Sequence, residues 1–194
     1  MKNLLLKIWA WFWAASLRTK GLVLLAVIAV IIMIRNFFKA HETIPAPTSV
    51  AFNAIVLPTQ KMRNDTLGLG HFGASRDGGT RTHEGVDILV YEGQPLYSPF
   101  EGILTKEFYP YSGDTRFYGF DLVGTGRFEG LKVRIMYCRA IKDKIGKAVK
   151  AGELVGYAQK ISKKYSVLMK DHIHVEVYEA GVLVDPTTHI KLTN

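Results

Sequence analysis

One uncharged apolar run near the N-terminus divides this chain of 194 residues into parts that must fold in different surroundings. The run reads GLVLLAVIAVIIMI over residues 21–34. As a helix it spans roughly 21 Å, which is short of a hydrocarbon core of about 30 Å. Continuing it through Phe38, with Arg35 reaching back to the interface, closes most of the gap. We therefore predict a transmembrane helix over 21–38. A cleaved signal peptide is the alternative, but the sequence after the run offers a poor cleavage site.

The segment before the run, residues 1–20, is basic and rich in tryptophan. Trp9, Trp11 and Trp13 favour the headgroup level of a bilayer, which predicts an interfacial helix, with a second, shorter span as the alternative. Basic residues are denser before residue 21 than after residue 34. The positive-inside tendency then predicts a single-pass membrane protein with a cytoplasmic N-terminus and a periplasmic or extracellular C-terminal domain.

The charge of the chain follows the same division. The formal net charge is +8, but residues 1–40 hold six of the 25 basic residues and no acidic one, which leaves 19 basic against 17 acidic residues in the rest. A nucleic-acid module carries its charge on the folded face that meets the phosphates. We therefore expect a membrane as partner of the N-terminal segment and no nucleic acid.

The remainder of the chain predicts a linker and one β domain. Residues 39–60 contain two prolines in HETIPAPTSV and form the linker, within which AFNAIVLP is either a first strand or a strap over the domain. From residue 61 to 194, short apolar runs are broken by Gly, Pro, Asp and Asn, and no helical period persists over three turns. This texture predicts a mostly β, compact antiparallel domain of sandwich type, with strands near Val86–Val90, Pro95–Ser98, Gly102–Phe108, Phe117–Val123, Val133–Tyr137, Leu154–Tyr157, His172–Tyr178 and Val182–Val184. The single cysteine, Cys138, excludes an internal disulfide and a cysteine-based zinc site.

Two motifs could carry chemistry. In THEGVDILV, residues 82–90, His83 and Asp87 lie four apart, with Gly85 between them to let the backbone turn. Taken alone, this motif is better explained as a turn with a capping aspartate and an exposed histidine, because a His and an Asp four residues apart are common. In DHIHVEVYE, residues 171–179, strand alternation puts His172, His174 and Glu176 on one face and apolar residues on the other.

Together the two motifs predict a zinc site. Zinc takes imidazole nitrogen and carboxylate oxygen in a tetrahedron, and a catalytic site leaves one position open. His83, Asp87 and His174 supply three such ligands from two distant strands. His172 is then placed to take a proton from water activated by the metal, because an imidazole titrates near neutral pH.

Several segments in order, HEGVDI, GQPLYSPFEGIL, MYCRA, KAGELVGYA and HIHVEVY, resemble the LytM or lysostaphin-type zinc metallopeptidases over roughly residues 65–190. The resemblance implies an antiparallel β fold, the duplicated hybrid motif, and activity on the peptide cross-links of bacterial cell walls. It also implies that His83, Asp87 and His174 are the zinc ligands and that His172 is a catalytic histidine.

One position departs from the family pattern. Where the family has Tyr-x-His-Leu, this chain has Tyr137-Cys138-Arg139-Ala140. Arginine can neither ligate zinc nor shuttle a proton, but it can stabilise a developing oxyanion as a fixed donor. The chemotaxin branch, which resembles this chain throughout the same region, also lacks this histidine and is not peptidolytic. Two hypotheses follow: a zinc endopeptidase that uses His172 and Arg139, or a zinc-binding module with a regulatory, binding or signalling role toward a wall peptide or a protein ligand.

Two weaker signals complete the sequence. Gly68, Gly70 and Gly73 form a GxGxxG pattern that lacks the preceding strand and following helix of a dinucleotide site, so a glycine-rich loop at the border of a cleft is expected, with His71 as a candidate to approach the metal. His189 is expected to be a surface residue.

Overall fold

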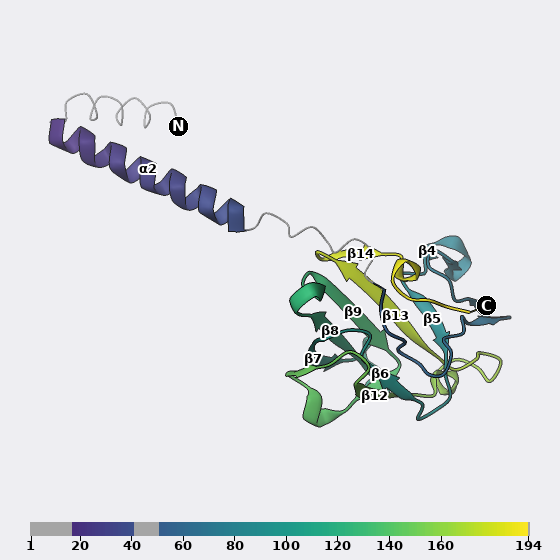
Figure 1. The fold of residues 1–194 in the computed structure, drawn as a ribbon. Coiled ribbons are helices and arrows are strands. Elements are labelled where there is room, and N and C mark those ends of the chain that lie inside the picture. The colour runs from purple at the N-terminus through teal and green to yellow at the C-terminus, as the bar shows by residue number, and fades with distance from the viewer. Residues whose placement is uncertain (1–16, 41–50, 194) are drawn as a thin grey trace. The chain divides into compact units, whose positions relative to one another are not determined.

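The computed structural model describes residues 17–40 and 51–193. The chain divides into two compact units, one ending at Thr43 and one beginning at Ile44. The first contains α2 (Leu17–Ala40), which covers the predicted segment 21–38 (Figure 1). None of the helical segments among the described residues combines the length and the apolarity of a membrane span. The transmembrane helix and the interfacial segment, most of which lies outside the described residues, therefore stay predictions.

The second unit is built from antiparallel sheets, as predicted. The larger sheet has seven strands in the order β11 (Lys147–Val149), β7 (Gly102–Phe108), β8 (Gly119–Gly124), β9 (Leu131–Met136), β13 (His172–Glu179) and β14 (Val182–Val184), while β5 (Val86–Leu89) also pairs with β13. The smaller sheet has the order β10 (Cys138–Ala140), β12 (Leu154–Ala158) and β6 (Pro95–Tyr97). The eight predicted strands are thus present, with ends that differ by a few residues.

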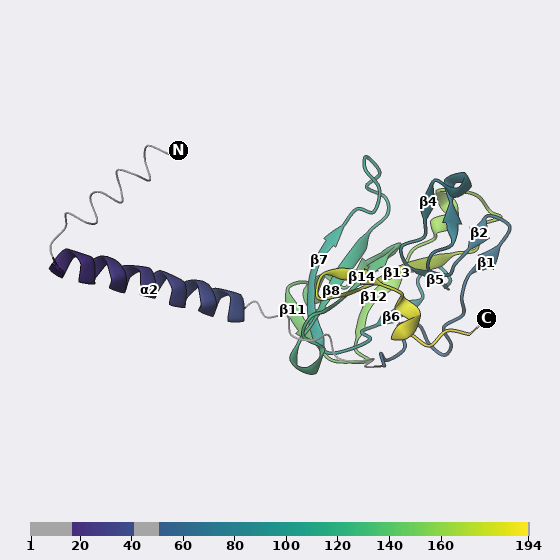
Figure 2. The ribbon, with the colours of Figure 1, turned by 90° about the horizontal axis from the view of Figure 1, so that it is seen from above.

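Short elements complete this unit. Two hairpins join β1 (Asn64–Asp65) to β2 (Gly68–Leu69) and β3 (Ser75–Arg76) to β4 (Arg81–Thr82). Five 3-10 turns are described: Asp77–Gly79, Gly126–Phe128, Lys142–Lys144, Ile161–Lys163 and Pro186–Thr188. Figure 2 shows β1, β2 and β4 at the end of the domain that holds β5, away from β7 and β11. These strands of two residues were not predicted, because so short a segment shows no alternation.

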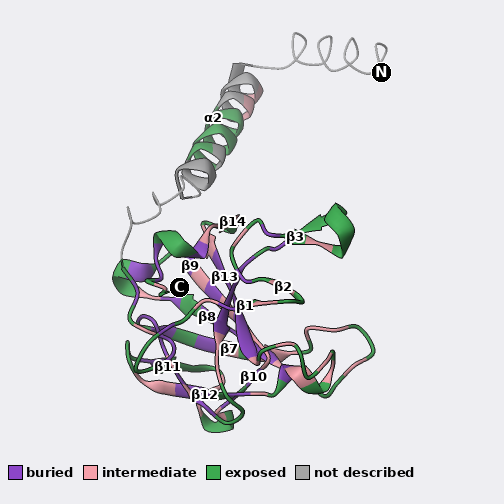
Figure 3. Ribbon diagram, turned by 90° about the vertical axis from the view of Figure 1, so that its right-hand side faces the viewer, coloured by how far each residue is buried: buried purple, intermediate pink, exposed green. Residues whose placement is uncertain are grey.

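The core lies between the two sheets and follows strand alternation. Ile173, Val175 and Val177 of β13 are fully buried in it, as are Leu96 of β6 and Val155 of β12. The opposite side chains of β13 are buried too, so this strand is covered on both faces (Figure 3). One face of β13 therefore packs the core, and the other is free to build a site.

Residues 51–60 pack onto the domain and resolve the alternatives left for this segment. Phe52 and Ile55 belong to the core, and Phe52 N–H donates to the backbone oxygen of His189. The segment contains no named strand and is a strap. The expectation that His189 lies at the surface is wrong: its ring stacks on Phe52 with centroids 4.6 Å apart and is 3% exposed.

Candidate metal centre

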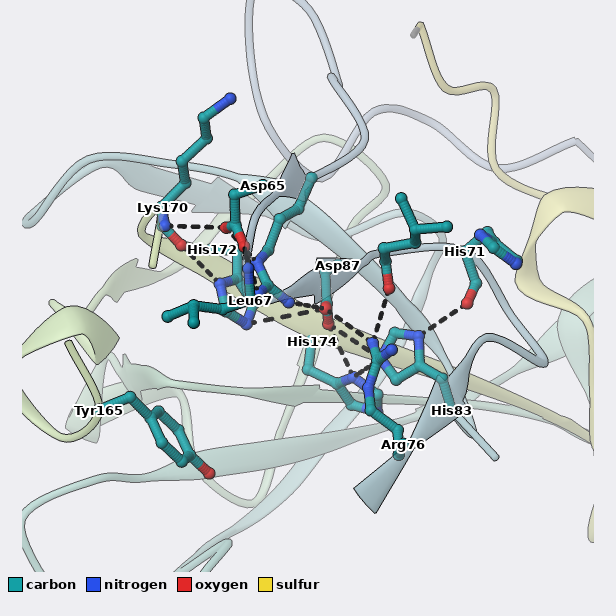
Figure 4. Close-up of polar contacts among 12 residues, drawn as sticks. Asp65, Leu67, His71, Arg76, His83, Asp87, Tyr165, Lys170, His172 and His174 are labelled. Atoms are coloured by element: carbon teal, nitrogen blue, oxygen red, sulfur yellow. Dashed lines mark hydrogen bonds and ion pairs between the residues drawn. The ribbon is translucent and has the colours of Figure 1, made fainter. Parts of the chain in front are cut away.

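The register between β5 and β13 brings the two sequence motifs together. Asp87 is the cross-strand partner of His174, and strand alternation turns both side chains away from the core. His83 lies three residues before the start of β5 and reaches the same point (Figure 4). One ligand atom from each of the three residues lies within 4.8 Å of the other two, and all three side chains are buried.

The three ligand atoms form a nearly equilateral triangle. His83 Nε2 lies 2.9 Å from His174 Nδ1, and both nitrogens lie 3.0 Å from Asp87 Oδ1. Tetrahedral zinc with bonds of about 2.0–2.1 Å separates its ligand atoms by roughly 3.3 Å, a few tenths of an ångström more. The size of the triangle therefore suits zinc.

The hydrogen bonds of the outer ring nitrogens fix the tautomers. His83 Nδ1 donates to the backbone oxygen of His71, 2.8 Å away, and His174 Nε2 faces Glu176 Oε1 at 3.4 Å. Both outer nitrogens must carry hydrogen, because carbonyl and carboxylate oxygens only accept. Two imidazole lone pairs then meet a carboxylate oxygen, an arrangement that needs a cation at its centre. The donor set fits a divalent metal.

Electrostatics favours a cation at the same point. Burial opposes ionisation of Asp87, but hydrogen bonds to His174 and His83 and the nearby His172 hold its pKa well below the usual range. Burial disfavours the imidazolium of His174, yet hydrogen bonds to Asp87 and Glu176 outweigh it and raise the pKa of His174 to about 9. A metal ion binding here competes with a proton.

His172 lies beside the cluster formed by His83, Asp87 and His174, and its ring is oriented so that it can act as a base. Its Nδ1 donates to the backbone oxygen of Lys170 at 2.7 Å, so in the neutral ring the lone pair is on Nε2, which lies 3.8 Å from Asp87 Oδ2. Burial lowers the pKa of His172 below its usual value, although the Asp87 carboxylate opposes this. The lowered pKa favours the neutral ring, which can accept a proton at Nε2.

Arg139, the predicted donor to an oxyanion, is not brought to the cluster. Its side chain is exposed, and its guanidinium carbon lies 3.3 Å from the centroid of the Tyr118 ring. Among the described residues, those that line the cavity over the metal cluster do not include it. The predicted catalytic role of Arg139 finds no geometric support.

The structure adds charged residues that the sequence did not single out. Arg63 Nη1 and Arg76 Nη2 lie 3.0 and 3.4 Å from Asp87 Oδ2, and Glu176 supports His174 from behind. Glu176 was visible as a third polar residue on the same strand face. Arg63 directly precedes β1 and Arg76 ends β3, and neither of these two-residue strands shows a pattern in the sequence. His71 contributes its backbone oxygen, while its side chain is exposed.

The cluster lies in a cavity of about 920 Å³. Hairpin residues line part of it, among them Arg76 and Gly68 of the predicted glycine-rich loop. An aromatic group lines another part: Tyr111 stacks on Tyr137 with centroids 5.8 Å apart and shares a hydroxyl hydrogen bond of 2.9 Å with Tyr165. The Tyr137 ring meets His172 edge-on at 5.5 Å. The cavity thus offers aromatic surface and guanidinium donors around the metal cluster.

Comparison with known proteins shows which family this chain is similar to. The model of peptidase family M23 matches residues 81–186. Leukocyte cell-derived chemotaxin-2 of Mus musculus is 32% identical over 127 residues, which are 65% of this chain and 76% of that protein.

Solved structures show a similar fold. Lysostaphin, in a solution structure, is 19% identical with a TM-score of 0.50, over 70% of this chain and 54% of that chain. Helicobacter pylori Csd3 is 17% identical with a TM-score of 0.50, over 74% of this chain and 36% of that one. This chain spans less than two thirds of either solved chain. Since the family model covers more than half of the 194 residues, the chain belongs to peptidase family M23, the LytM and lysostaphin type, and resembles its chemotaxin branch.

Proposed function

We propose that this chain is a membrane-anchored zinc metalloendopeptidase that cleaves peptide cross-links of the cell wall. The observation that carries the proposal is the convergence of His83 Nε2, Asp87 Oδ1 and His174 Nδ1 in a triangle of 2.9–3.0 Å, open to a cavity. Membership of family M23 supports the reaction class.

Each residue of the site has a task in this reaction. When bound, zinc supplies a Lewis acid that polarises a carbonyl and lowers the pKa of water. His172 accepts the proton at Nε2, because its Nδ1–H is held by Lys170. Arg76 lines the cavity and donates from Nη2 to Oδ2 of the ligand Asp87 at 3.4 Å, and the tyrosine group offers flat surface for a peptide backbone.

The test is cleavage of a defined substrate. The full-length chain, loaded with zinc and incubated with cross-linked muropeptides, is expected to release new amine ends, and His172→Ala is expected to keep stoichiometric zinc but lose at least about 100-fold in turnover. His71→Ala is the matched control, since its exposed ring can be removed while the backbone oxygen remains. Undiminished turnover in His172→Ala would remove the proposed base.

A second function has an observation of its own. Arg139 stands where the peptidases of this type have a histidine, it rests on Tyr118, and the chemotaxin relative is 32% identical. These features favour a zinc-binding module that recognises a wall peptide or a protein ligand without cutting it. Zinc-loaded protein that binds muropeptides and releases no amine ends would favour this second function.

The membrane anchor and the topology form part of the proposal. The uncharged run at 21–34 and the basic residues before it support a single span over 21–38 with the zinc domain outside the cytoplasm. A reporter that is active only outside the cytoplasm is expected to be active when it is fused after the C-terminus. Activity of a reporter that functions only in the cytoplasm would reverse this topology.

A further inference from the structure

The hairpin that precedes the metal motif holds a buried charge pair that the proposed reaction does not use. Asp65 binds Arg63 with two hydrogen bonds, Oδ2 to Nε at 2.7 Å and Oδ1 to Nη2 at 2.8 Å. Both side chains are 4% exposed. A buried ion pair of this kind contributes little net stability because desolvation offsets the attraction. Its position beside the metal cluster therefore invites a different role.

The remaining guanidinium nitrogen of Arg63 reaches a metal ligand. Arg63 Nη1 donates to Asp87 Oδ2 at 3.0 Å, and the backbone N–H of Arg63 donates to the backbone oxygen of Asp87 at 2.8 Å. A free carboxylate has two equivalent oxygens and can rotate. With Oδ2 held by Arg63, and by Arg76 at 3.4 Å, only Oδ1 faces the imidazoles of the cluster.

Asp65 connects the same hairpin to His172. Its two oxygens accept four hydrogen bonds, two from Arg63 and one each from the backbone N–H groups of Leu67 and Lys170. Lys170 is the residue whose backbone oxygen accepts the Nδ1 hydrogen of His172. Figure 4 shows Asp65 between Lys170 and the Asp87 cluster. The Asp65 carboxylate thus holds both Arg63, which binds the ligand Asp87, and the backbone of Lys170, which binds the proposed base His172.

We infer that Asp65 and Arg63 are positioning residues of the metal centre: Arg63 selects the oxygen of Asp87 that faces the metal, and Asp65 orients Arg63 and, through Lys170, the ring of His172. This inference rests on the proposed zinc site. Residues that support metal ligands in this way typically contribute 10- to 100-fold to metal affinity. The positive charge of Arg63 alone acts in the opposite direction, because a guanidinium near a divalent cation weakens binding of that cation.

The two effects of Arg63 on zinc affinity, positioning of Asp87 and charge repulsion, have opposite signs, so a measurement of zinc affinity distinguishes them. Zinc dissociation constants of the full-length chain are measured by competition with a chromogenic chelator, which requires no activity. Arg63→Met is expected to weaken zinc binding by about 10- to 100-fold, and Arg63→Lys, which keeps the charge but not the planar fork, by about tenfold or more. Asp65→Asn is expected to weaken it by about tenfold, since the amide keeps the shape but loses the ion pair.

Arg116→Met is the matched control, because Arg116 also binds an aspartate two residues away, Asp114, through Nε and Nη2. It removes the same charge and the same kind of pair at an exposed place, and zinc affinity is expected to stay within twofold. Arg63→Met that binds zinc as tightly as the wild type, or more tightly, overturns the inference, as does wild-type affinity in Arg63→Lys.

Circular dichroism of each variant shows whether it folds. If Arg63→Met does not fold, Arg63→Lys and Asp65→Asn decide. A wild-type chain that binds no zinc would refute the proposed metal site itself, whereas wild-type binding with unchanged variants refutes only the positioning role.

Discussion

Gly85 gives the strictest test of how the strands build the metal cluster. A Cβ atom placed on Gly85 would lie 2.4 Å from the backbone oxygen of Val175 and 2.8 Å from two ring atoms of His174. The first distance is about 1 Å short of the 3.4 Å at which ordinary contact begins. Gly85→Ala must therefore push β5 and β13 apart, and these two strands carry Asp87 and His174.

The magnitude follows from that displacement. Opening the 3.0 Å contact between His174 Nδ1 and Asp87 Oδ1 by such a distance takes it beyond the ligand spacing of tetrahedral zinc, roughly 3.3 Å. We expect at least a ~100-fold loss of zinc affinity, about 2.7 kcal/mol, together with about 1–3 kcal/mol of overpacking in the apo protein. Chelator competition measures the first quantity, and urea denaturation in the presence of a chelator measures the second.

Gly102→Ala separates the two effects. Its added Cβ would lie 2.4 Å from the backbone oxygen of Val123, so the clash matches that of Gly85. Gly102 lies in β7, separated from β13 by β8 and β9. This variant is expected to lose similar stability and to keep its zinc affinity. Equal zinc affinity in both variants, whether retained or lost, would refute the steric argument.

Two further predictions concern the metal itself. At a free zinc concentration 100-fold above the dissociation constant, binding adds about 2.7 kcal/mol to the free energy of unfolding, so a chelator is expected to lower the Tm by about 5–11 °C in a domain of this size; equal melting with and without chelator would contradict it. Because the pKa of His174 is raised to about 9 and zinc needs the unprotonated ring, a proton must leave at any lower pH, and apparent zinc affinity is expected to fall by about tenfold from pH 8 to pH 7. Calorimetry in buffers of different ionisation enthalpy then shows release of about one proton at pH 7.5, and the absence of release would contradict the raised pKa.

Strand alternation explains why so much of this site could be predicted. His172, His174 and Glu176 face away from a core formed by Ile173 and Val175, and a period of two is visible in the sequence alone. The pairing of His174 with Asp87 could be predicted only from chemistry, because zinc needs three protein ligands. The register between β5 and β13 is set by packing and is not visible in the sequence. The structure supplies that register.

The reason for Gly85 could not be found in the sequence. We expected a glycine there to let the backbone turn, but Gly85 is absent from the described glycines with positive φ. A glycine is needed here because there is no room for a side chain: the imidazole of His174 and the backbone oxygen of Val175 occupy that volume. Contacts across strands far apart in sequence leave no local signal, and the same is true of Arg63 against Asp87.

The prediction for Arg139 failed because strand alternation does not continue through this part of the chain. Tyr137 has a φ of 64°, a left-handed conformation that interrupts the strand alternation. It stands between β9 of the larger sheet and β10 of the smaller one, so the chain changes sheets within the motif. Tyr137 meets the edge of His172, while Arg139, two residues on, rests on Tyr118. Cationic groups do reach Asp87, but they come from Arg63 and Arg76 in the N-terminal hairpins, and they act on the ligand rather than on a developing oxyanion.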